Sequence, residues 1–512
     1  MSTPPPAATP THIASLPSLQ ARYGERYRWL LLLSVMVGTM ASIMSSTIVN
    51  VAIPGMSHHF GLGQERAQWV SSGFMVAMTV AMLTTPWLLS RYGYRKTYVG
   101  CMVLLMAGGI AGGLASQYWL VLAARVAEGL AAGAVQPIPA IIILRAFQPH
   151  EQGRASGIFG MGVVLAPAIG PSIGGVLVDL FGWRSIFFMV VPFCMASIVL
   201  AYKLVPTTAP GGVAASREGD LDSRGLLLAT VGTLCLLNGL VQLRGDAPLQ
   251  AALLLLGAVA SVAAFLWWQK RLSARGRTPL MNLDLFSHRQ FAAGSLVAFI
   301  YGTALFGSTY LLPVYMQLGL QLSASHVGTI LLPAGIILAL TIAGVGRLAD
   351  RQPTRVLVSI GLALLAASFA LMMLLKIGGS LWWLVIFATI GRIGLGFILP
   401  SLNLGSMRPL PKSLIAQGAS AISFLRMLGG AAGVSLCAIV LEWRIAAHGD
   451  SLIAPATSPA RIAAFDEVFA LLAALCAVAI FAAWQLREPR GAAAPADLPP
   501  TPASPASTTQ AK

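Results

Sequence analysis

The sequence contains unbroken apolar runs that are long enough to cross a lipid bilayer, and residues 29–54 and 251–268 are two examples. A membrane-spanning helix needs about 20 mostly apolar residues. Soluble domains carry roughly 25% charged residues, whereas this chain has 10% charged and 56% apolar residues. A transmembrane β-barrel would instead show alternating segments of about ten residues. The runs therefore predict an all-α polytopic membrane protein and exclude a soluble enzyme.

The apolar runs, and the Gly, Pro and charged residues between them, predict fourteen transmembrane helices. Two pairs of segments indicate related halves: loop 90–96 is similar to loop 346–351, and Arg125–Gly129 is similar to Arg392–Gly396. We expect two six-helix bundles with two inserted helices between them. The expected parts are a cytoplasmic N-terminal tail (1–28), an N-terminal bundle (29–204), a linker with the inserted helices (205–290), a C-terminal bundle (291–486) and a disordered cytoplasmic tail (487–512).

Lys and Arg are distributed unevenly between the two sides of the predicted membrane protein. Of the 33 Lys and Arg residues, 24 fall on the side that carries both termini, 6 on the other side and 3 inside the spans. Because cytoplasmic loops are enriched in Lys and Arg, we expect both termini in the cytoplasm. The net charge of +16 then marks the cytoplasmic face, and no nucleic-acid partner is expected.

Arg125 and Glu128 are charged residues within the fourth predicted span. They lie one helical turn apart, so that they can form an ion pair that offsets much of the cost of burial. One interpretation is a structural packing pair. The other is that Glu128 takes up and releases a proton while Arg125 sets its proton affinity.

Neutral polar and aromatic side chains at the depth of the spans predict a mildly polar cavity. Each of them has a second interpretation as a contact between helices, and the aromatic residues could also stack on a lipophilic cation. Arg392 and Arg426 lie inside later spans, where each could hold backbone carbonyls together. The expected cavity residues are Asn50, Gln136, Asn238, Tyr301, Tyr310, Asn403, Gln417 and Arg426.

The fifth predicted span is rich in glycine and proline between residues 160 and 175. Small residues let helices approach closely, and proline bends a helix. Such a helix suits tight packing combined with rocking against a partner, although a static contact is the alternative. The residues expected to form this conformational motif are Gly160, Pro167, Gly170, Pro171, Gly174 and Gly175.

No metal site or cofactor is expected. The five cysteines lie inside apolar runs without metal-ligand spacing, and His58 and His59 have no third ligand nearby in the sequence. The chain also lacks a phosphate-binding Gly-Lys-Ser/Thr run. Neither ATP hydrolysis nor another enzymatic activity is therefore predicted.

Five segments together resemble the major facilitator superfamily, and specifically its 14-span drug:proton antiporter branch of multidrug exporters. Thr47–Pro54 resembles the motif of the first span, Arg125–Gly129 that of the fourth, and Gly160–Gly175 the antiporter motif of the fifth. Trp183–Phe188 is similar to the segment that opens the sixth span, and Gln417–Gly433 to span 13. The resemblance covers about residues 25–487.

The chain departs from the pattern of this branch at three positions. Ser45 stands where the first-span motif commonly has Asp, and Glu128 stands where the fourth-span motif usually has Gln. We hypothesise that Glu128 takes over proton coupling from the missing acid. Ser90 replaces the acid of the loop after span 2, whereas its second copy keeps Asp350. A cytoplasmic loop gate is expected to act mainly on the side of Asp350, and its residues are Arg91, Gly93, Arg95, Asp350 and Arg351.

The resemblance implies a secondary active transporter that exports lipophilic or cationic drugs by proton antiport and alternating access. Glu128 and Arg125 would carry the proton coupling. The alternatives are an exporter of one endogenous metabolite, an uncoupled facilitator and, less favoured, a membrane sensor or enzyme that does not transport. The implied location is a bacterial inner membrane. The expected partners are a small lipophilic substrate, protons and the lipid bilayer, with a periplasmic adaptor and an outer-membrane channel as candidates.

Overall fold

The computed structural model describes residues 16–207, 220–243, 248–375, 380–450 and 458–486. Within these ranges the secondary structure consists of helices, and no strand is found. The prediction of an all-α polytopic protein is confirmed. Most of the two expected tails (1–28 and 487–512) lies outside the described residues, and residues 16–23 of the first tail form a short helix, α1 (Leu16–Tyr23).

The first group of helices, here called the N-bundle, runs from α2 to α8. In the absence of water, a helix satisfies its backbone polar groups internally, which explains why each long apolar run is helical. The N-bundle consists of α2 (Tyr27–Phe60), α3 (Gln64–Ala81), α4 (Thr85–Leu114), α5 (Tyr118–Val135), α6 (Ile138–Ala146), α7 (Gln152–Phe181) and α8 (Ser185–Leu204).

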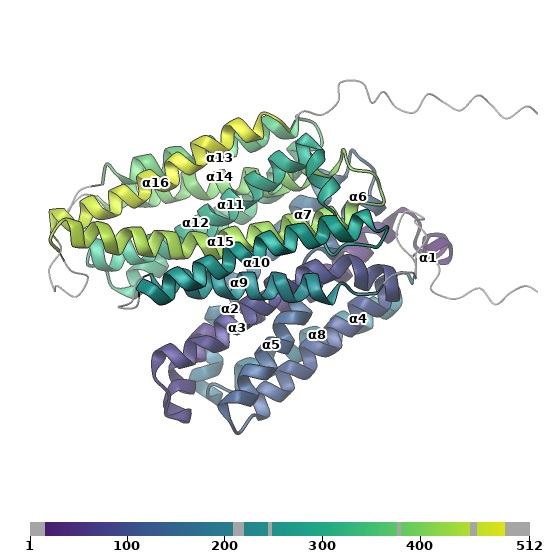
Figure 1. The fold of residues 1–512 in the computed structure, drawn as a ribbon, viewed down its shortest axis with the longest axis horizontal. Coiled ribbons are helices and arrows are strands. Elements are labelled where there is room, and N and C mark those ends of the chain that lie inside the picture. Colours follow the sequence, from purple (N-terminus) through teal and green to yellow (C-terminus); the bar gives the residue numbers. More distant parts are fainter. Residues whose placement is uncertain (1–15, 208–219, 244–247, 376–379, 451–457, 487–512) are drawn as a thin grey trace, which may run out of the picture.

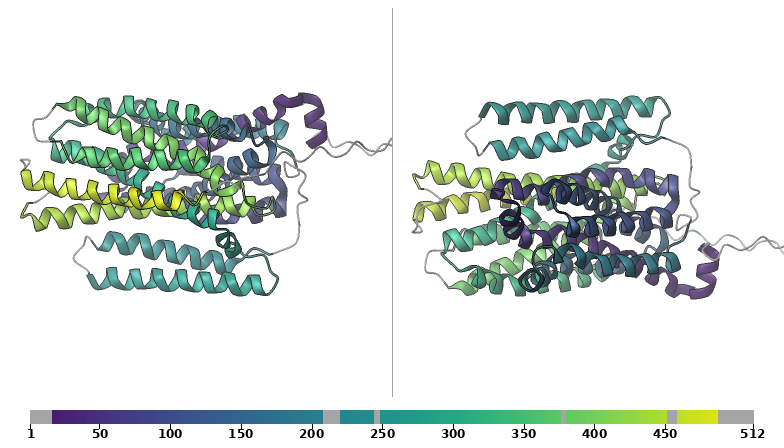
Figure 2. Two further views of the ribbon diagram at one scale, coloured as in Figure 1. Left: turned by 90° about the horizontal axis from the view of Figure 1, so that it is seen from above. Right: turned by 90° about the horizontal axis from the view of Figure 1, so that it is seen from below.

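The second group, here called the C-bundle, runs from α11 to α16. It consists of α11 (Arg289–Val314), α12 (Ala324–Leu348), α13 (Thr354–Met372), α14 (Leu381–Met407), α15 (Ile415–Ala447) and α16 (Pro459–Ala483). Between the bundles in sequence lies the inserted pair, α9 (Ser223–Gln242) and α10 (Pro248–Ala274). Figure 2 shows this pair lying together along one side of the two bundles, where α9 packs on α3 and α15.

Twelve helical segments of the described chain are long and apolar enough to cross a membrane. One of them, Arg66–Leu114, contains two crossings because the backbone reverses at Gly93, where φ is +77°. The hydroxyl of Thr97 donates to the carbonyl of Leu88 across this reversal. Together with the 30-residue α7, this gives the fourteen transmembrane helices predicted from the sequence.

The fourth predicted span, which the apolar run 118–146 indicates, contains a break between two helices. α5 ends at Val135 and α6 begins at Ile138, with Gln136 and Pro137 between them. Proline has no N–H to donate and clashes with the preceding turn of a helix, so a break here follows from its chemistry. The predicted residue Gln136 therefore lies at a helix break.

The two bundles converge at one end of the molecule and diverge toward the other (Figure 1). The end at which they converge carries α1, α6 and the loops after α12 and α14, and it is here called the basic end because most Lys and Arg residues lie there. Side-chain hydrogen bonds from two arginines join the bundles at the basic end. Arg145 donates to the Lys412 carbonyl at 2.9 Å, and Arg408 donates to Gln152 and to the Pro149 carbonyl.

Glycines allow α7 of the N-bundle to pack directly on α12 of the C-bundle. A Cβ atom on Gly157 would lie 2.8 Å from both the Cα of Gly346 and the carbonyl oxygen of Ile342. A Cβ on Gly160 would lie 2.8 Å from the Ile342 side chain. Real Cβ atoms do not approach other atoms so closely. The contact between the bundles therefore depends on Gly157 and Gly160. Gly160 belongs to the expected conformational motif, and Gly157 lies three residues before it.

We predict that Gly157→Leu separates the bundles at the basic end, because the added side chain has no space against Gly346. Spin labels at Tyr92 and Gln352, in a chain whose native cysteines are replaced, would report the distance between the bundles. The distance should increase by several ångströms in Gly157→Leu. Gly175→Leu is the matched control on the same helix, since a Cβ there meets no atom within 4 Å. Equal distances in both variants would contradict the role of Gly157.

Candidate functional site

Arg125 and Glu128 form a buried ion pair on α5, as their spacing predicts. Arg125 Nη1 lies 2.5 Å from Glu128 Oε2. The two residues are 1% and 0% exposed. An ion in hydrocarbon costs several kcal/mol unless it is compensated. Each charge therefore offsets part of the free-energy cost of burying the other.

Neighbouring helices complete the surroundings of this pair. Ser45 of α2 accepts a hydrogen bond from Arg125 Nη1 at 2.9 Å and donates to Glu128 Oε2 at 3.4 Å. On α3, the Val70 carbonyl accepts from Arg125 Nε at 3.3 Å, and the Phe74 ring lies 4.1 Å below the guanidinium carbon. A cation over an aromatic face is attracted by the ring quadrupole. The pair thus connects α2, α3 and α5.

The structure brings together two of the three positions at which the sequence departs from the antiporter motifs. Ser45, at the position of the missing acid, contacts both members of the ion pair, and the additional acid is Glu128 itself. A carboxylate at either position would lie next to the same guanidinium. The sequence alone does not give this distance, because residues 45 and 128 are on different helices.

Two glycines of α4 make room for Glu128. A Cβ on Gly108 would lie 2.6 Å from Glu128 Cγ, and one on Gly109 would lie 3.4 Å from its Oε1. Despite this tight packing, Glu128 Oε1 and Arg125 Nη2 have no hydrogen-bond partner among the described residues. Each is a buried polar atom with unused hydrogen-bonding capacity.

Three predicted cavity residues lie in the N-bundle or the inserted pair. Asn50 is exposed, and its Oδ1 accepts a hydrogen bond from Ser71 of α3 at 3.0 Å. Gln136 is partly buried at the break between α5 and α6. Asn238 lies on α9 of the inserted pair and donates to the Leu234 carbonyl of its own helix. Its side chain is therefore occupied within α9.

The predicted cavity residues of the C-bundle are distributed over three helices. Tyr301 of α11 is 2% exposed and interacts electrostatically with Arg426 of α15 and with Arg392 of α14. Tyr310, Asn403 and Gln417 are partly buried on α11, α14 and α15. The structure thus groups Tyr301 and Arg426 and adds Arg392 to them.

The conformational motif of α7 contacts both bundles. Gly160 faces Ile342 and Leu399 of the C-bundle, whereas Gly170 and Gly174 face α2 of their own bundle. Pro167 is partly buried, and nothing packs within 4 Å of the position of a Cβ on Gly175. The side chain of Pro171 lies outside the described residues.

The expected loop gate contains one contact between the bundles, and it is made by Asp350. Its carboxylate accepts hydrogen bonds from the backbone N–H groups of Gly153 at 2.6 Å and Arg154 at 2.8 Å. These N–H groups belong to the first turn of α7, where the helix dipole favours a negative charge. The Arg408 guanidinium lies 3.9 Å away. Burial raises the pKa of Asp350, whereas the two N–H groups and Arg408 lower it.

Gly93 and Arg95 of the expected gate contact the segment that follows α8 of their own bundle. Gly93 has φ +77°, and a Cβ there would collide with the Thr207 carbonyl. Arg95 donates to the Val205 carbonyl at 2.7 Å. Arg91 and Arg351 are exposed. These residues shape the basic end of the separate bundles, and Asp350 links the two.

Comparison with known proteins identifies the family. The model of the Major Facilitator Superfamily matches residues 35–434. The chain belongs to the Major Facilitator Superfamily. It is 26% identical to the uncharacterized MFS-type transporter YcnB of Bacillus subtilis over 456 residues, which cover 89% of this chain and 94% of YcnB.

A drug-resistance protein and a solved structure are also similar to the chain. The multidrug resistance protein B homolog of Mycobacterium tuberculosis is 28% identical over 459 residues, covering 87% of this chain and 84% of the homolog. The crystal structure of the human organic anion transporter MFSD10 superposes with a TM-score of 0.62 at 16% identity, covering 90% of this chain and 99% of that chain. This structural likeness shows a shared fold. The chain is a transporter of this superfamily and not an enzyme.

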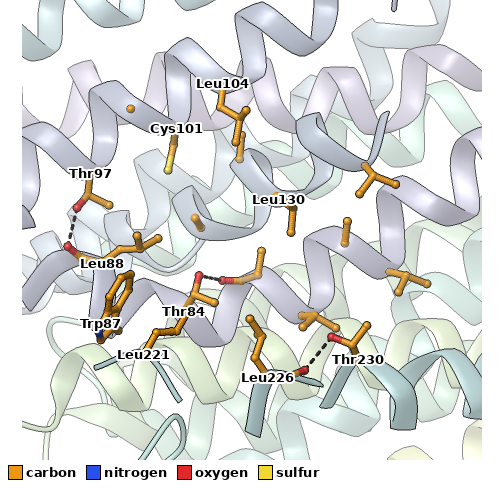
Figure 3. A pocket seen from close by; sticks show the side chains of 18 of the residues that line it. Thr84, Trp87, Leu88, Thr97, Cys101, Leu104, Leu130, Leu221, Leu226 and Thr230 are labelled. Carbon is orange, nitrogen blue, oxygen red and sulfur yellow. Dashed lines mark hydrogen bonds between the residues drawn. The ribbon is translucent and has the colours of Figure 1, made fainter. Parts of the chain in front are cut away.

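An apolar pocket of about 770 Å³ lies between the N-bundle and α9 of this superfamily member (Figure 3). Its walls come from α3, α4, α5 and α9. The hydroxyl groups of Thr84, Thr97 and Thr230 point to carbonyls of nearby backbone. The pocket can therefore accept an apolar group but offers few free polar groups to orient it. None of the predicted cavity residues lines it.

Charged residues at the end of the C-bundle opposite the basic end were missed by the sequence analysis. Arg461 of α16 is fully buried, pairs with Asp450 at 3.3 Å and donates to the Leu318 carbonyl. Asp466, one turn further along α16, interacts electrostatically with Tyr315. The sequence signal for this group was Asp466, an acid near the start of the last apolar run. The sequence analysis gave it no role because it lies close to the predicted end of that span.

We predict that Glu128→Leu destabilises the protein by about 3–5 kcal/mol, because it leaves the buried Arg125 charge without a partner. Arg125→Met combined with Glu128→Leu should recover most of this loss, since apolar side chains then fill the space of the pair. Thermal unfolding of the full chain in nanodiscs would measure both effects. Arg444→Gln, in the exposed Arg444–Glu467 pair, is the control and should change the midpoint little. An unchanged midpoint in Glu128→Leu would show that the pair is not the source of stability.

Proposed function

We propose that this transporter exports small lipophilic drugs from the cytoplasm of a bacterium by proton antiport, with alternating access of its two bundles. The observation that carries the proposal is the buried group of Ser45, Arg125 and Glu128. A titratable acid held beside an arginine inside a membrane protein is suited to proton coupling. The relative in Mycobacterium tuberculosis that is named a multidrug resistance protein B homolog supports a drug as substrate.

The distribution of charge supports an orientation in which the basic end lies on the cytoplasmic side of the inner membrane. Cytoplasmic loops of membrane proteins carry the excess of Lys and Arg. In this orientation the bundles are in contact on the cytoplasmic side and diverge on the outer side. We assign this arrangement to the outward-facing state. The return to the inward-facing state then requires release of Asp350 from the first turn of α7.

The free atom of Glu128 provides a place for the proton. Its Oε2 is bonded to Arg125 and Ser45, whereas its Oε1 has no partner among the described residues. A proton can therefore add at Oε1 without first breaking these bonds. Protonation removes the negative charge and weakens the attraction to Arg125. Arg125 keeps the Val70 carbonyl and the Phe74 ring, so α5 and α2 are less strongly joined while α3 stays attached.

Efflux from cells that lack other exporters would test this proposal with two fluorescent compounds of matched structure. Dansylglycine is anionic and dansylcadaverine is cationic. The wild type should export at least one of them, and a protonophore should abolish the export. Glu128→Gln, at equal membrane abundance, should lower protonophore-sensitive efflux at least tenfold, because the amide neither binds nor releases the proton.

A relocated acid provides the matched control. Ser45 Oγ is 2.9 Å from Arg125 Nη1, so an aspartate at this position can pair with the same guanidinium. We predict that Ser45→Asp combined with Glu128→Gln restores a substantial part of the coupled efflux, whereas Ser45→Asn combined with Glu128→Gln does not. Full export by Glu128→Gln against a gradient would place the coupling elsewhere. Export of neither compound by the wild type would favour a transporter of one endogenous metabolite.

A further inference from the structure

Arg392 and Arg426 are two cations within the membrane-spanning part of the C-bundle. Arg392 lies in the middle of α14, and Arg426 lies in the first half of α15. Each residue is partly buried. Charged side chains at such depth are costly and usually mark a ligand or ion pathway. Their presence therefore needs an explanation.

Neither guanidinium has a hydrogen bond or an ion pair to the residues that the structure describes. α11 and α14 contain no Asp or Glu, and the acid on α15 is Glu442, sixteen residues beyond Arg426. This separation corresponds to about 24 Å along a helix. The acids of the helix α16, Asp466 and Glu467, lie in its first third, toward the other end of the bundle from the basic end.

The buried arginine of the N-bundle, Arg125, is in contrast surrounded by partners. Arg125 has a carboxylate at 2.5 Å, a hydroxyl, a carbonyl and an aromatic ring around it. The electrostatic partner recorded for both Arg392 and Arg426 is the neutral phenol of Tyr301. The C-bundle therefore presents two positive charges whose compensation does not come from the described part of the chain.

Packing places these residues toward the space between the helices. Arg392 shares a face of α14 with Gly396 and Leu399, since the spacings are four and seven residues. Gly396 packs on Thr341 of α12, and Leu399 lies near Gly160 of the N-bundle. The Arg426 carbonyl lies against Gly302 of α11, next to Tyr301. The face of α14 that bears Arg392 is thus directed toward the other bundle.

We propose that Arg392 and Arg426, with the Tyr301 hydroxyl, bind the carboxylate of an organic anion, and that the exported compounds are lipophilic acids. This inference rests on the proposed export function and specifies its substrate class. A guanidinium presents its N–H donors in a planar fork that matches a carboxylate. A bound carboxylate supplies the compensating negative charge that the two arginines lack. A cationic compound would be repelled from the same place.

Binding to the purified full chain in nanodiscs tests this inference without a proton gradient. Fluorescence titration with dansylglycine should give saturable binding to the wild type. Arg392→Gln and Arg426→Gln should each weaken it at least tenfold, and Tyr301→Phe should weaken it by a smaller factor. Arg392→Lys and Arg426→Lys should retain more affinity than the Gln variants, because the positive charge is kept. Dansylcadaverine should bind more weakly than dansylglycine to the wild type.

Two controls separate a specific site from general effects. Arg444→Gln removes an exposed arginine at the other end of α15 and should leave dansylglycine binding unchanged. Thermal unfolding in the same nanodiscs verifies that each variant is folded. Equal dansylglycine affinity in the wild type and both Gln variants, tighter binding of dansylcadaverine, or binding of neither compound would overturn the inference. Coupled efflux that depends on Glu128 would survive such a result, so the two proposals can fail separately.

Discussion

The ion pair between Arg125 and Glu128 lies where α2, α3, α4 and α5 meet, and the packing of the N-bundle is arranged around it. Its burial requires an environment that supplies hydrogen bonds from one side and small residues from the other. Ser45 and Val70 meet the first requirement, and Gly108 and Gly109 meet the second. A larger residue at Gly108 would displace the carboxylate, and loss of the carboxylate would leave a cation in a dry interior.

The two bundles differ in how their buried arginines are compensated. The sequence analysis expected Arg125 and Arg392 to lie in related segments, yet Arg125 is paired within its own helix and Arg392 is not. In the proposed exporter, this difference gives the two bundles different functions. The N-bundle would hold the site that responds to protons, and the C-bundle would hold the site that recognises the compound.

The sequence predicted the long helices well because membrane crossing depends on local hydropathy and length. The reversal at Gly93 lies within the charged loop 90–96 and could be expected, whereas the apolar run 118–146 concealed the break at Gln136 and Pro137. The spacing of Arg125 and Glu128 predicts their pairing because both lie on one helix. Local periodicity does not determine how separate helices are rotated against each other. The contact of Ser45, the grouping of Arg392 with Tyr301 and the isolated position of Asn238 therefore required the structure.

The contact between Ser45 and the ion pair changes how two substitutions should be counted. In a linear comparison with the antiporter motifs, a lost aspartate at one position and a gained glutamate 83 positions later are separate events. In space the two positions are neighbours, since both side chains contact the guanidinium of Arg125. A survey of relatives that scores acids column by column would treat the two positions as independent, although they share one arginine.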